Sequence, residues 1–248
     1  MKPRVSIVVP AYNEGDAIEE FLGRVLESVE LPCELLVVVD SVDDTTNPYV
    51  EKFARVDPRA RLVLNTIGPG PAHAIRFGIQ EALADVAVVT MADGSDDPRQ
   101  IDQLVRPVER GVVVAAASRY SHGGQQVGGP LIKGTMSKLA GLSLAWFARV
   151  GTRDATNSFK AYDMHFVRTV GIESDAGFEI GIELVAKAKR ARLPVAELPT
   201  IWLERHHGMS NFKLASWIPR YLRWWFFAFG PRIPVEEIRQ AARRSDAS

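Results

Sequence analysis

Short, mostly apolar runs alternate along the chain with segments whose apolar positions recur every three or four residues. The apolar runs occupy residues 5–9, 35–39, 61–64, 86–91 and 112–116. Between the first two runs, the spacing of one helix face is shown by Ile18, Phe21, Leu22, Val25 and Leu26. Strands that are apolar throughout and alternate with helices are typical of parallel sheets buried on both faces. The pattern therefore predicts an α/β fold with a doubly wound, mostly parallel sheet.

Polar side chains follow three of these runs at the point where each strand should end. They are Tyr12, Asn13 and Glu14 after the first run, Asp40, Asp43 and Asp44 after the second, and Asp93, Ser95, Asp96 and Asp97 after the fourth. In open α/β sheets, ligands bind outside the carboxyl ends of the strands. We therefore expect three acidic clusters to meet on one rim of the sheet.

Beyond Tyr120 the pattern is less regular. Residues 121–130 are rich in Gly and Gln and are long enough to form a mobile loop, whereas residues 139–150 and 178–191 have helical spacing. Residues 217–229 are dominated by aromatic side chains and include Arg220 and Arg223. Such a stretch suits a membrane interface, but it suits packing against the sheet or a homodimer contact equally well.

Composition narrows the class of protein. The chain has 248 residues, of which 46% are apolar and 24% charged, and this excludes a disordered or fibrous chain. Thirty basic residues balance thirty acidic ones, so we expect no nucleic-acid partner. The single Cys33 excludes an intramolecular disulfide and fits a reducing, cytoplasmic compartment. No apolar run approaches the roughly 20 residues that span a bilayer, so we expect any membrane association to be peripheral.

The acidic clusters suggest a divalent metal. Crowded carboxylates raise one another's pKa unless a cation neutralises them, and oxygen ligands favour Mg²⁺ or Mn²⁺. Such ions bind one or two carboxylates together with substrate phosphates, so we expect a nucleotide diphosphate to be held through a metal at Asp93. The alternative for Asp96 and Asp97, which precede Pro98, is to cap a helix that begins near Arg99. We assign Asp97 to the cap and Asp93 to the metal.

A second anion site is predicted in the basic segment 205–213. Arg205, His206, Ser210 and Lys213 have the chemistry to surround a phosphate, and Gly208 permits close approach of the backbone. The segment alone is equally consistent with a solvated basic loop.

Taken together, the motifs resemble the inverting glycosyltransferases of family two, which have the GT-A fold. Within that family the sequence is similar to the dolichol- and polyprenyl-phosphate mannose synthases, over roughly residues 4–215. The resemblance is carried, in the family's order, by VVPAYNE, VVVDSVDDTT, GPGPAHAIRFGI, VVTMADGSDDP, ASRY with DATNSFKAYD, and FEIGIELVAKAKRA with the later ELP and ERHHGMSNFK. It implies a GT-A domain at residues 1–215 and an aromatic, basic helical extension with a tail at residues 216–248.

The resemblance also implies a donor site and an acceptor. The donor, a GDP- or UDP-sugar, is expected to bind Pro10, Ala11, Tyr12, Glu14, Asp40, Asp44, Ala72, Ala92 and Asp93. Mg²⁺ or Mn²⁺ is expected on Asp93, with Ser95 assisting. The acceptor is expected to be a polyprenyl phosphate, which is already anionic and needs positive charge more than a general base. The candidates that hold this phosphate are Arg119, Lys133, Arg205, Ser210 and Lys213, and the catalytic residues are expected to be Asp93, Arg119 and Arg205.

The sequence departs from the family pattern at four places. Met91 replaces the first aspartate of the metal motif, Ser41 and Val42 replace Gly-Ser, Ser158 replaces a glycine, and Asn211 replaces a lysine. Two other functions therefore stay open. One is a soluble glycosyltransferase acting on a hydroxyl, with Glu179 or Asp154 as base. The other is a nucleotide-sugar-binding protein without transfer activity, for which Met91 is the argument.

Overall fold

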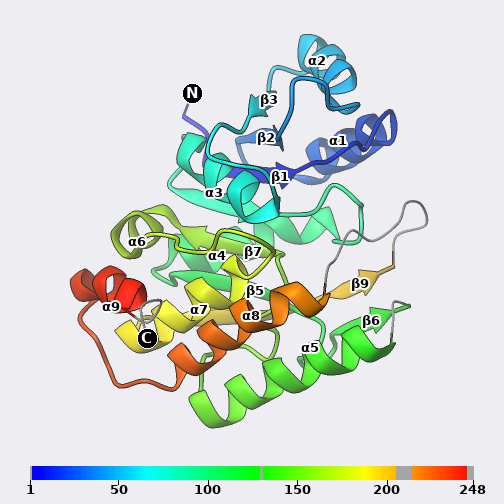
Figure 1. Ribbon diagram of the computed structural model, residues 1–248. Coiled ribbons are helices and arrows are strands. Elements are labelled where there is room, and N and C mark those ends of the chain that lie inside the picture. Colours follow the sequence, from blue (N-terminus) through cyan, green and yellow to red (C-terminus); the bar gives the residue numbers. More distant parts are fainter. Residues whose placement is uncertain (1, 129–130, 205–213, 245–248) are drawn as a thin grey trace.

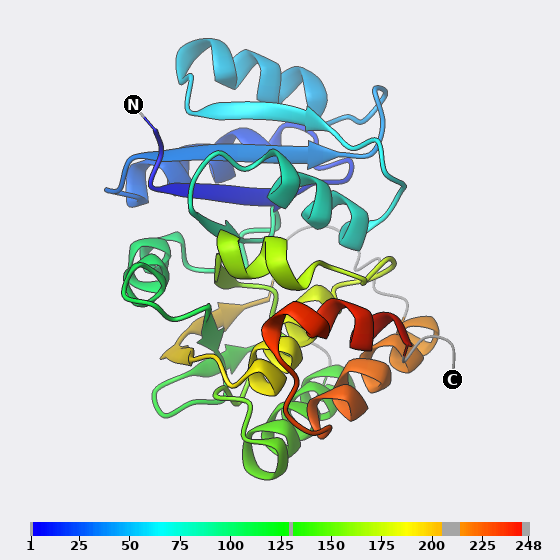
Figure 2. The ribbon, with the colours of Figure 1, turned by 90° about the vertical axis from the view of Figure 1, so that its left-hand side faces the viewer.

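The central feature is a seven-stranded sheet with the strand order β3-β2-β1-β4-β7-β5-β8 (Figures 1 and 2). The computed structural model describes residues 2–128, 131–204 and 214–244. The strands are β1 (Val5–Pro10), β2 (Cys33–Val39), β3 (Ala60–Leu64), β4 (Val86–Val89), β5 (Val114–Ser118), β7 (Lys160–Asp163) and β8 (Val195–Pro199). Neighbouring strands are parallel except at β7, which is antiparallel to both β4 and β5.

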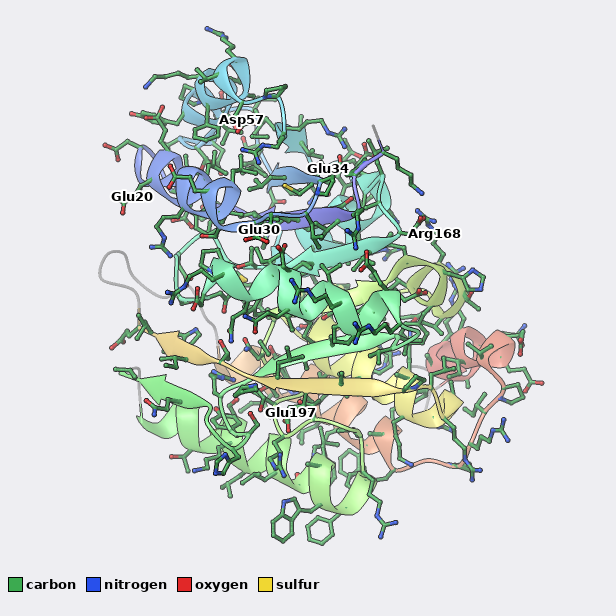
Figure 3. All side chains as sticks on the ribbon, turned by 180° about the vertical axis from the view of Figure 1, so that it is seen from behind. Glu20, Glu30, Glu34, Asp57, Arg168 and Glu197 are labelled. Carbon is green, nitrogen blue, oxygen red and sulfur yellow. The ribbon has the colours of Figure 1, made fainter. Side chains whose placement is uncertain are left out.

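Helices cover both faces of this sheet. They are α1 (Ala17–Ser28), α2 (Asn47–Val56), α3 (Pro71–Glu81), α4 (Ile101–Glu109), α6 (Met164–Val170) and α7 (Ile180–Ala191). Alternate strand residues face opposite layers: Ile7 and Val37 pack with α1 and α4, while Val8 and Val38 pack with α3. Figure 3 shows the first of these faces, with Glu20 of α1 directed away from the sheet. The predicted doubly wound α/β fold is thus confirmed.

Three helical segments and a small second sheet follow β5 in the chain and complete this half of the molecule. α5 (Leu131–Ser143) continues into one turn of π-helix, η2 (Leu144–Ala148), and α8 (Leu214–Ala228) packs on α7. The short helix α9 (Ile238–Arg244) follows η3 (Val235–Glu237), a turn of 3-10 helix, and packs against α6 and α7. A two-stranded parallel sheet joins β6 (Gln125–Val127) to β9 (Ile201–Leu203). Within the described residues, none of the helices combines the length and the apolar character needed to cross a bilayer.

The structure corrects the predicted elements in detail. β7 was not predicted, because its residues are Lys160, Ala161, Tyr162 and Asp163 and lack an apolar run. Residues 112–116 were predicted as a strand, but β5 begins and ends two residues later.

The aromatic stretch at the C-terminal end divides between the core and the surface. Trp224 and Phe227 are buried, with 1% and 6% exposure, and belong to the same core as the residues of α7. Phe226 is 65% exposed. The prediction that this stretch packs against the rest of the fold is therefore confirmed for Trp224 and Phe227, whereas Phe226 is exposed to solvent. The predicted domain boundary at residue 215 stays a prediction.

Candidate functional site

The carboxyl ends of β1 and β2 lie side by side and carry the first predicted donor residues. Pro10 pairs with Val38 across the two strands, and Ala11 beyond it is buried. Tyr12 follows with 62% of its surface exposed. The backbone N–H of Glu14 donates to the hydroxyl of Thr46 at 3.0 Å. The two strand ends therefore form one connected rim, with an exposed aromatic ring at its edge.

Asp40, the first residue after β2, ties that strand to the glycine-rich turn before α3. The side-chain amide of Asn65 donates to Oδ1 of Asp40 at 2.7 Å, and the backbone N–H of Gly70 donates to Oδ2 at 2.7 Å. Gly68 and Gly70 have φ angles of 143° and 108°, which favour glycine. The glycine-rich turn is thus anchored to a predicted donor residue, and Ala72 lies fully buried just beyond it.

Asp44 is also buried and uses its carboxylate to hold the loop after β1. Both of its oxygens accept from the backbone N–H of Asn13 at 3.1 Å, and Oδ1 accepts from the backbone N–H of Thr46 at 2.8 Å. Asn13 has a φ of 54°, in the left-handed region that Asn tolerates. Asp44 therefore fixes the shape of the loop that carries Tyr12 and Glu14.

The third cluster follows β4, and its aspartates have separate structural roles. Oδ1 of Asp93 accepts from the backbone N–H of Ser95 at 3.0 Å, and the Asp93 side chain is half-buried. Asp96 is buried, and it accepts from the hydroxyl of Thr90 at 3.0 Å and the backbone N–H of Met91 at 3.2 Å. Burial and the neighbouring charge of Asp93 raise the pKa of Asp96 to about 7.

Asp97 caps the turn of 3-10 helix η1 (Pro98–Gln100) before α4, as the sequence predicts. Its carboxylate accepts from the backbone N–H of Arg99 at 3.1 Å, and the Arg99 side chain pairs with it at 2.8 Å. Asp93 and Asp97 are both partly exposed, but only Asp97 forms this cap, and the buried Ser95 follows Asp93 by two residues.

The metal hypothesis can be tested against this donor set. In the part of the chain that the structure describes, no three His, Cys, Asp or Glu side chains are grouped so as to hold a metal. Mg²⁺ and Mn²⁺ commonly bind one or two carboxylates and take their other ligands from substrate phosphates and water. The half-buried carboxylate of Asp93 fits an ion that is held in this way.

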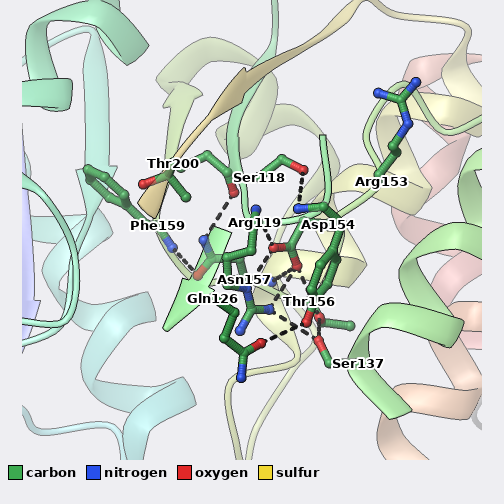
Figure 4. A network of polar contacts seen from close by, with 12 residues as sticks. Ser118, Arg119, Gln126, Ser137, Arg153, Asp154, Thr156, Asn157, Phe159 and Thr200 are labelled. Carbon is green, nitrogen blue, oxygen red and sulfur yellow. Dashed lines mark hydrogen bonds and ion pairs between the residues drawn. The ribbon is translucent and has the colours of Figure 1, made fainter. Parts of the chain in front are cut away.

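Arg119 and Asp154 form the most buried ion pair at this end of the sheet (Figure 4). Nε of Arg119 lies 2.7 Å from Oδ2 of Asp154, and Nη2 lies 2.9 Å from Oδ1. The backbone N–H of Arg119 also donates to Oδ2 at 3.0 Å. Nη2 reaches the hydroxyl of Ser137 on α5 at 3.1 Å, and the guanidinium lies 5.0 Å from the ring centre of Tyr120. Asp154 is fully buried, so its carboxylate holds the guanidinium of Arg119 from the protein interior.

The loop that carries Asp154 is itself held by a buried lysine. Nζ of Lys160 donates to the backbone carbonyls of Ala155, at 3.2 Å, and of Asn157. The side chain of Asn157 donates in turn to the carbonyl of Ala117 on β5 at 3.0 Å. Burial lowers the pKa of Lys160 to about 7, against the opposing charge of Asp154. Lys160 therefore supports Asp154, which in turn supports Arg119.

One relationship connects the Asp93 loop with Arg119, and a second connects the same loop with β9. Burial and the charge of Asp93 raise the pKa of Asp96, and the positive charge of Arg119 partly offsets this rise. The backbone N–H of Leu203, in β9, donates to the carbonyl of Ser95 at 3.2 Å. β9 is the strand that precedes the basic segment, so residue 203 is fixed beside the Asp93 loop.

The remaining predicted acceptor residues lie outside the described part of the chain. Residues 205–213, and with them Arg205, Ser210 and Lys213, are not described. Lys133 belongs to α5, but its side chain is also outside the description. Their role in holding a phosphate stays a prediction.

Comparison with known proteins decides the family. The family model "Glycosyl transferase family 2" matches residues 6–171, which include the rim, the Asp93 loop and the Arg119–Asp154 pair. The chain belongs to glycosyl transferase family 2. The resemblance inferred from the motifs is therefore confirmed, and the protein is a glycosyltransferase.

Relatives of this glycosyltransferase include enzymes named for lipid phosphates. It is 28% identical to polyprenol monophosphomannose synthase of Mycolicibacterium smegmatis, over 86% of each chain. It is 30% identical to dolichol-phosphate mannosyltransferase of Pyrococcus furiosus, over 89% of this chain and 62% of that one. The crystal structure of glucosyl-3-phosphoglycerate synthase from Mycobacterium tuberculosis, in complex with Mn²⁺, UDP-glucose and phosphoglyceric acid, superposes with a TM-score of 0.70. That match covers 93% of this chain and 81% of that chain at 18% identity, and it supports the GT-A fold.

Some site residues of this glycosyltransferase were not predicted as such. Asp154 was considered only as an alternative base, and its pairing with Arg119 brings together residues 35 positions apart. Glu179, the other alternative base, is buried and accepts from the backbone N–H groups of Ala176 and Gly177 at 3.1 and 2.8 Å. Both carboxylates are therefore engaged inside the protein. Lys160 lies in the DATNSFKAYD motif, which is the signal by which it could have been found.

Proposed function

We propose that this family 2 glycosyltransferase transfers a hexose of the mannose or glucose type from a nucleotide diphosphate sugar to a polyprenyl phosphate, with inversion at the anomeric carbon. The observation that carries the proposal is the guanidinium of Arg119, which is oriented by the buried Asp154 at the end of the sheet where Asp93 lies. A fixed cation opposite a donor site suits an acceptor that is itself an anion. The names of the relatives, which include polyprenol and dolichol phosphate mannose synthases, support the same acceptor.

On the donor side, the chain supplies a pre-shaped rim. Asp40 and Asp44 hold the turn before α3 and the loop after β1, and Tyr12 offers an exposed ring beside them. We propose that the nucleoside lies along this rim and that the diphosphate points toward Asp93. The neighbours with Mn²⁺ and UDP in their crystals support a divalent metal there. Held by Asp93 with Ser95 beside it, a divalent ion would screen the negative charge of the diphosphate.

On the acceptor side, one phosphate oxygen attacks the anomeric carbon while the bond from that carbon to the diphosphate oxygen breaks. The attack comes from the face opposite the leaving group, which inverts the centre. The phosphate is already ionised at neutral pH, so no side chain has to remove a proton. Arg119 binds and orients the phosphate, and its pairing with Asp154 limits the directions that the guanidinium can take. In this proposal Lys133, Arg205, Ser210 and Lys213 add to the same phosphate site.

The location of the protein follows from the proposed acceptor. A polyprenyl phosphate resides in a bilayer, so we propose that the protein works as a peripheral protein at the cytoplasmic face of the membrane. GDP- and UDP-sugars both remain candidates for the donor, and a homodimer stays a further proposal.

The proposal is tested by incubating the full chain with labelled GDP- and UDP-sugars, Mg²⁺ or Mn²⁺, and a polyprenyl phosphate. Label that enters the organic phase supports it, and proton NMR of the product then gives the anomeric configuration. A water-soluble glycoside would instead indicate a hydroxyl acceptor. Nucleotide binding without turnover would indicate a protein that binds the sugar nucleotide without transferring it.

A further inference from the structure

Two neighbouring aromatic side chains project into solvent at the end of the long helix α5. Trp146 is 73% exposed and Phe147 77% exposed, and both lie on the π-helical turn η2. Leu139, on α5, is 63% exposed. Scattered apolar residues on a surface are ordinary, but adjacent large aromatics with three-quarters of their area in water usually mark a binding surface.

Helix α8 extends this surface. The indole N–H of Trp225 donates to the hydroxyl of Ser143 at 2.9 Å, which ties α8 to the end of α5. The ring of Trp225 packs against Phe226 and Phe229, with ring centres 5.0 and 4.6 Å apart, and these two rings are 65% and 42% exposed. Together, the exposed side chains of Leu139, Trp146, Phe147, Phe226 and Phe229 form a surface that we call the α5–α8 face. Figures 1 and 2 show α5 and α8 together at the end of the molecule farthest from α2 and β3.

The two segments that carry the α5–α8 face contain only basic charged residues, of which Arg153 pairs with Glu197 and Arg220 with Asp175 from other segments. Residues 131–153 contain Lys133, Lys138, Arg149 and Arg153, and residues 214–235 contain Arg220, Arg223 and Arg232. Neither range contains an aspartate or a glutamate. Because the whole chain is neutral, the rest of it carries the opposite net charge. An apolar surface surrounded by lysine and arginine is complementary to a bilayer that contains anionic lipids.

The same helix leads from the α5–α8 face to the proposed phosphate site. Ser137, on α5, contacts the guanidinium of Arg119 at 3.1 Å. Trp146 lies nine residues further along the chain, which corresponds to about 14 Å at the rise of an α-helix. Leu139, which is exposed, lies between them, and the exposed Met136 lies directly before Ser137. A lipid phosphate at Arg119 would therefore have its hydrocarbon chain within reach of an apolar surface.

We propose that the α5–α8 face docks the protein on an anionic lipid bilayer, with Trp146 and Phe147 inserted at the interface. The inference rests on the proposed function and adds to it the surface that contacts the membrane. It differs from the interface predicted from residues 217–229, because the buried Trp224 and Phe227 are excluded and α5 with η2 carries the most exposed rings.

The test is co-sedimentation of the full chain with vesicles of phosphatidylcholine alone and of phosphatidylcholine with 30% phosphatidylglycerol. The variant is Trp146→Ser with Phe147→Ser, both of which lie outside the catalytic machinery. Its control is Val56→Ser with Leu83→Ser, since these side chains are 86% and 60% exposed elsewhere on the molecule. A second variant, Lys138→Glu with Arg149→Glu, changes only the charge beside the face.

The wild type and the control should bind the anionic vesicles, while the aromatic variant should bind at least tenfold more weakly. The charge variant should lose its preference for anionic vesicles. Transfer to a water-soluble, short-chain prenyl phosphate should be unchanged in all variants, which separates docking from the proposed chemistry. Equal vesicle binding by the wild type and the aromatic variant would overturn the proposal. So would a dimer in sedimentation velocity that the aromatic variant dissociates, because the face would then be covered by a second copy.

Discussion

The guanidinium of Arg119 and the carboxylate of Asp154 meet in a two-point contact, with N–O distances of 2.7 and 2.9 Å. Asp154 is fully buried, and only 12% of the Arg119 side chain is exposed. Breaking a buried pair by removing one partner leaves an uncompensated charge, which typically costs about 3–5 kcal/mol. The pair therefore fixes the direction of the Arg119 guanidinium. It also makes the stability of the fold depend on both residues.

Replacing Asp154→Asn should preserve the shape of the loop while removing the charge that holds Arg119. We expect the free energy of unfolding to fall by about 3–5 kcal/mol, because one buried cation loses its counterion. We also expect the KM for a prenyl phosphate to rise at least tenfold. Urea denaturation and steady-state kinetics measure the two effects.

The control for this prediction lies next to it in the sequence. Arg153 pairs with Glu197 at 2.7 Å, but its side chain is 47% exposed. Arg153→Ala should cost less than about 1 kcal/mol, as exposed pairs do, and should leave the acceptor KM unchanged. Similar effects of Asp154→Asn and Arg153→Ala on that KM would argue against a positioning role for Asp154.

Lys160 should make stability depend on pH. Its pKa is lowered from 10.5 to about 7 by burial, so between these values the unfolded chain binds more protons than the folded one. The free energy of unfolding should therefore rise with pH across this window, by roughly 1.4 kcal/mol per pH unit at most, and this gain should be lost progressively as the pH falls from 10.5 to about 7. Lys160→Met should abolish this rise, as measured by urea denaturation at pH 7.5 and 9.5.

The same variant tests whether Lys160 supports the acceptor site. Lys160→Met removes the donor to the carbonyls of Ala155 and Asn157, and we expect it to raise the KM for the acceptor more than the KM for the donor. Lys160→Arg, which restores both a charge and donors, should recover most of the acceptor affinity. If Lys160→Arg fails to rescue while folding normally, hydrogen bonding to this loop is not what the site requires.

Asp93 and Asp97 provide a matched pair of carboxylates for testing the donor side. Asp93→Asn retains the acceptor for the Ser95 N–H but loses the charge, so kcat should fall at least about 100-fold, as when one electrostatic contact to the leaving group is removed. Asp97→Asn keeps a good cap and should stay close to the wild type. Both variants should unfold at the same urea concentration within error. Retained activity in Asp93→Asn contradicts the assignment of this residue.

Asp40 should affect donor binding through the turn that it holds. Asp40→Ala leaves the N–H of Gly70 without its acceptor and the side-chain amide of Asn65 with only the carbonyl of Gly68, which costs about 1–3 kcal/mol. We expect the KM for the nucleotide sugar to rise with little change in the acceptor KM. Asp43→Ala, at an exposed position in the same loop, serves as the control and should change neither. An unchanged donor KM in Asp40→Ala would remove this residue from the donor site.

Most of the sheet could be predicted from the sequence because its parallel strands are buried on both faces. Runs such as residues 35–39 contain no polar position, and a short segment without polar positions is typical of a strand that is buried on both faces. β7 could not be predicted in this way. It places Lys160 inside the protein through hydrogen bonds to carbonyls, and burial of a lysine has no signature in apolar periodicity.

The site was predictable where it depends on strand ends and unpredictable where it depends on partners. The ends of β1, β2 and β4 carry Tyr12, Asp40 and Asp93 because of topology, and the spacing of polar residues after each apolar run indicates this. Contacts between residues far apart in the sequence decide which carboxylates stabilise loops and which face the site. Asp44 and Asp96 accept from backbone N–H groups, and these partners could not be predicted from the spacing of the acidic residues.

The central claim is that the acceptor reacts through a phosphate bound by Arg119. The most direct test compares kcat/KM for a short-chain prenyl phosphate and for the prenol of the same chain length, with the same sugar nucleotide and metal. The account predicts transfer to the phosphate, at least 100-fold weaker transfer to the alcohol, and a collapse of this preference in Arg119→Ala. Equal transfer to the two acceptors, or a preference for the phosphate that Arg119→Ala leaves intact, would contradict it.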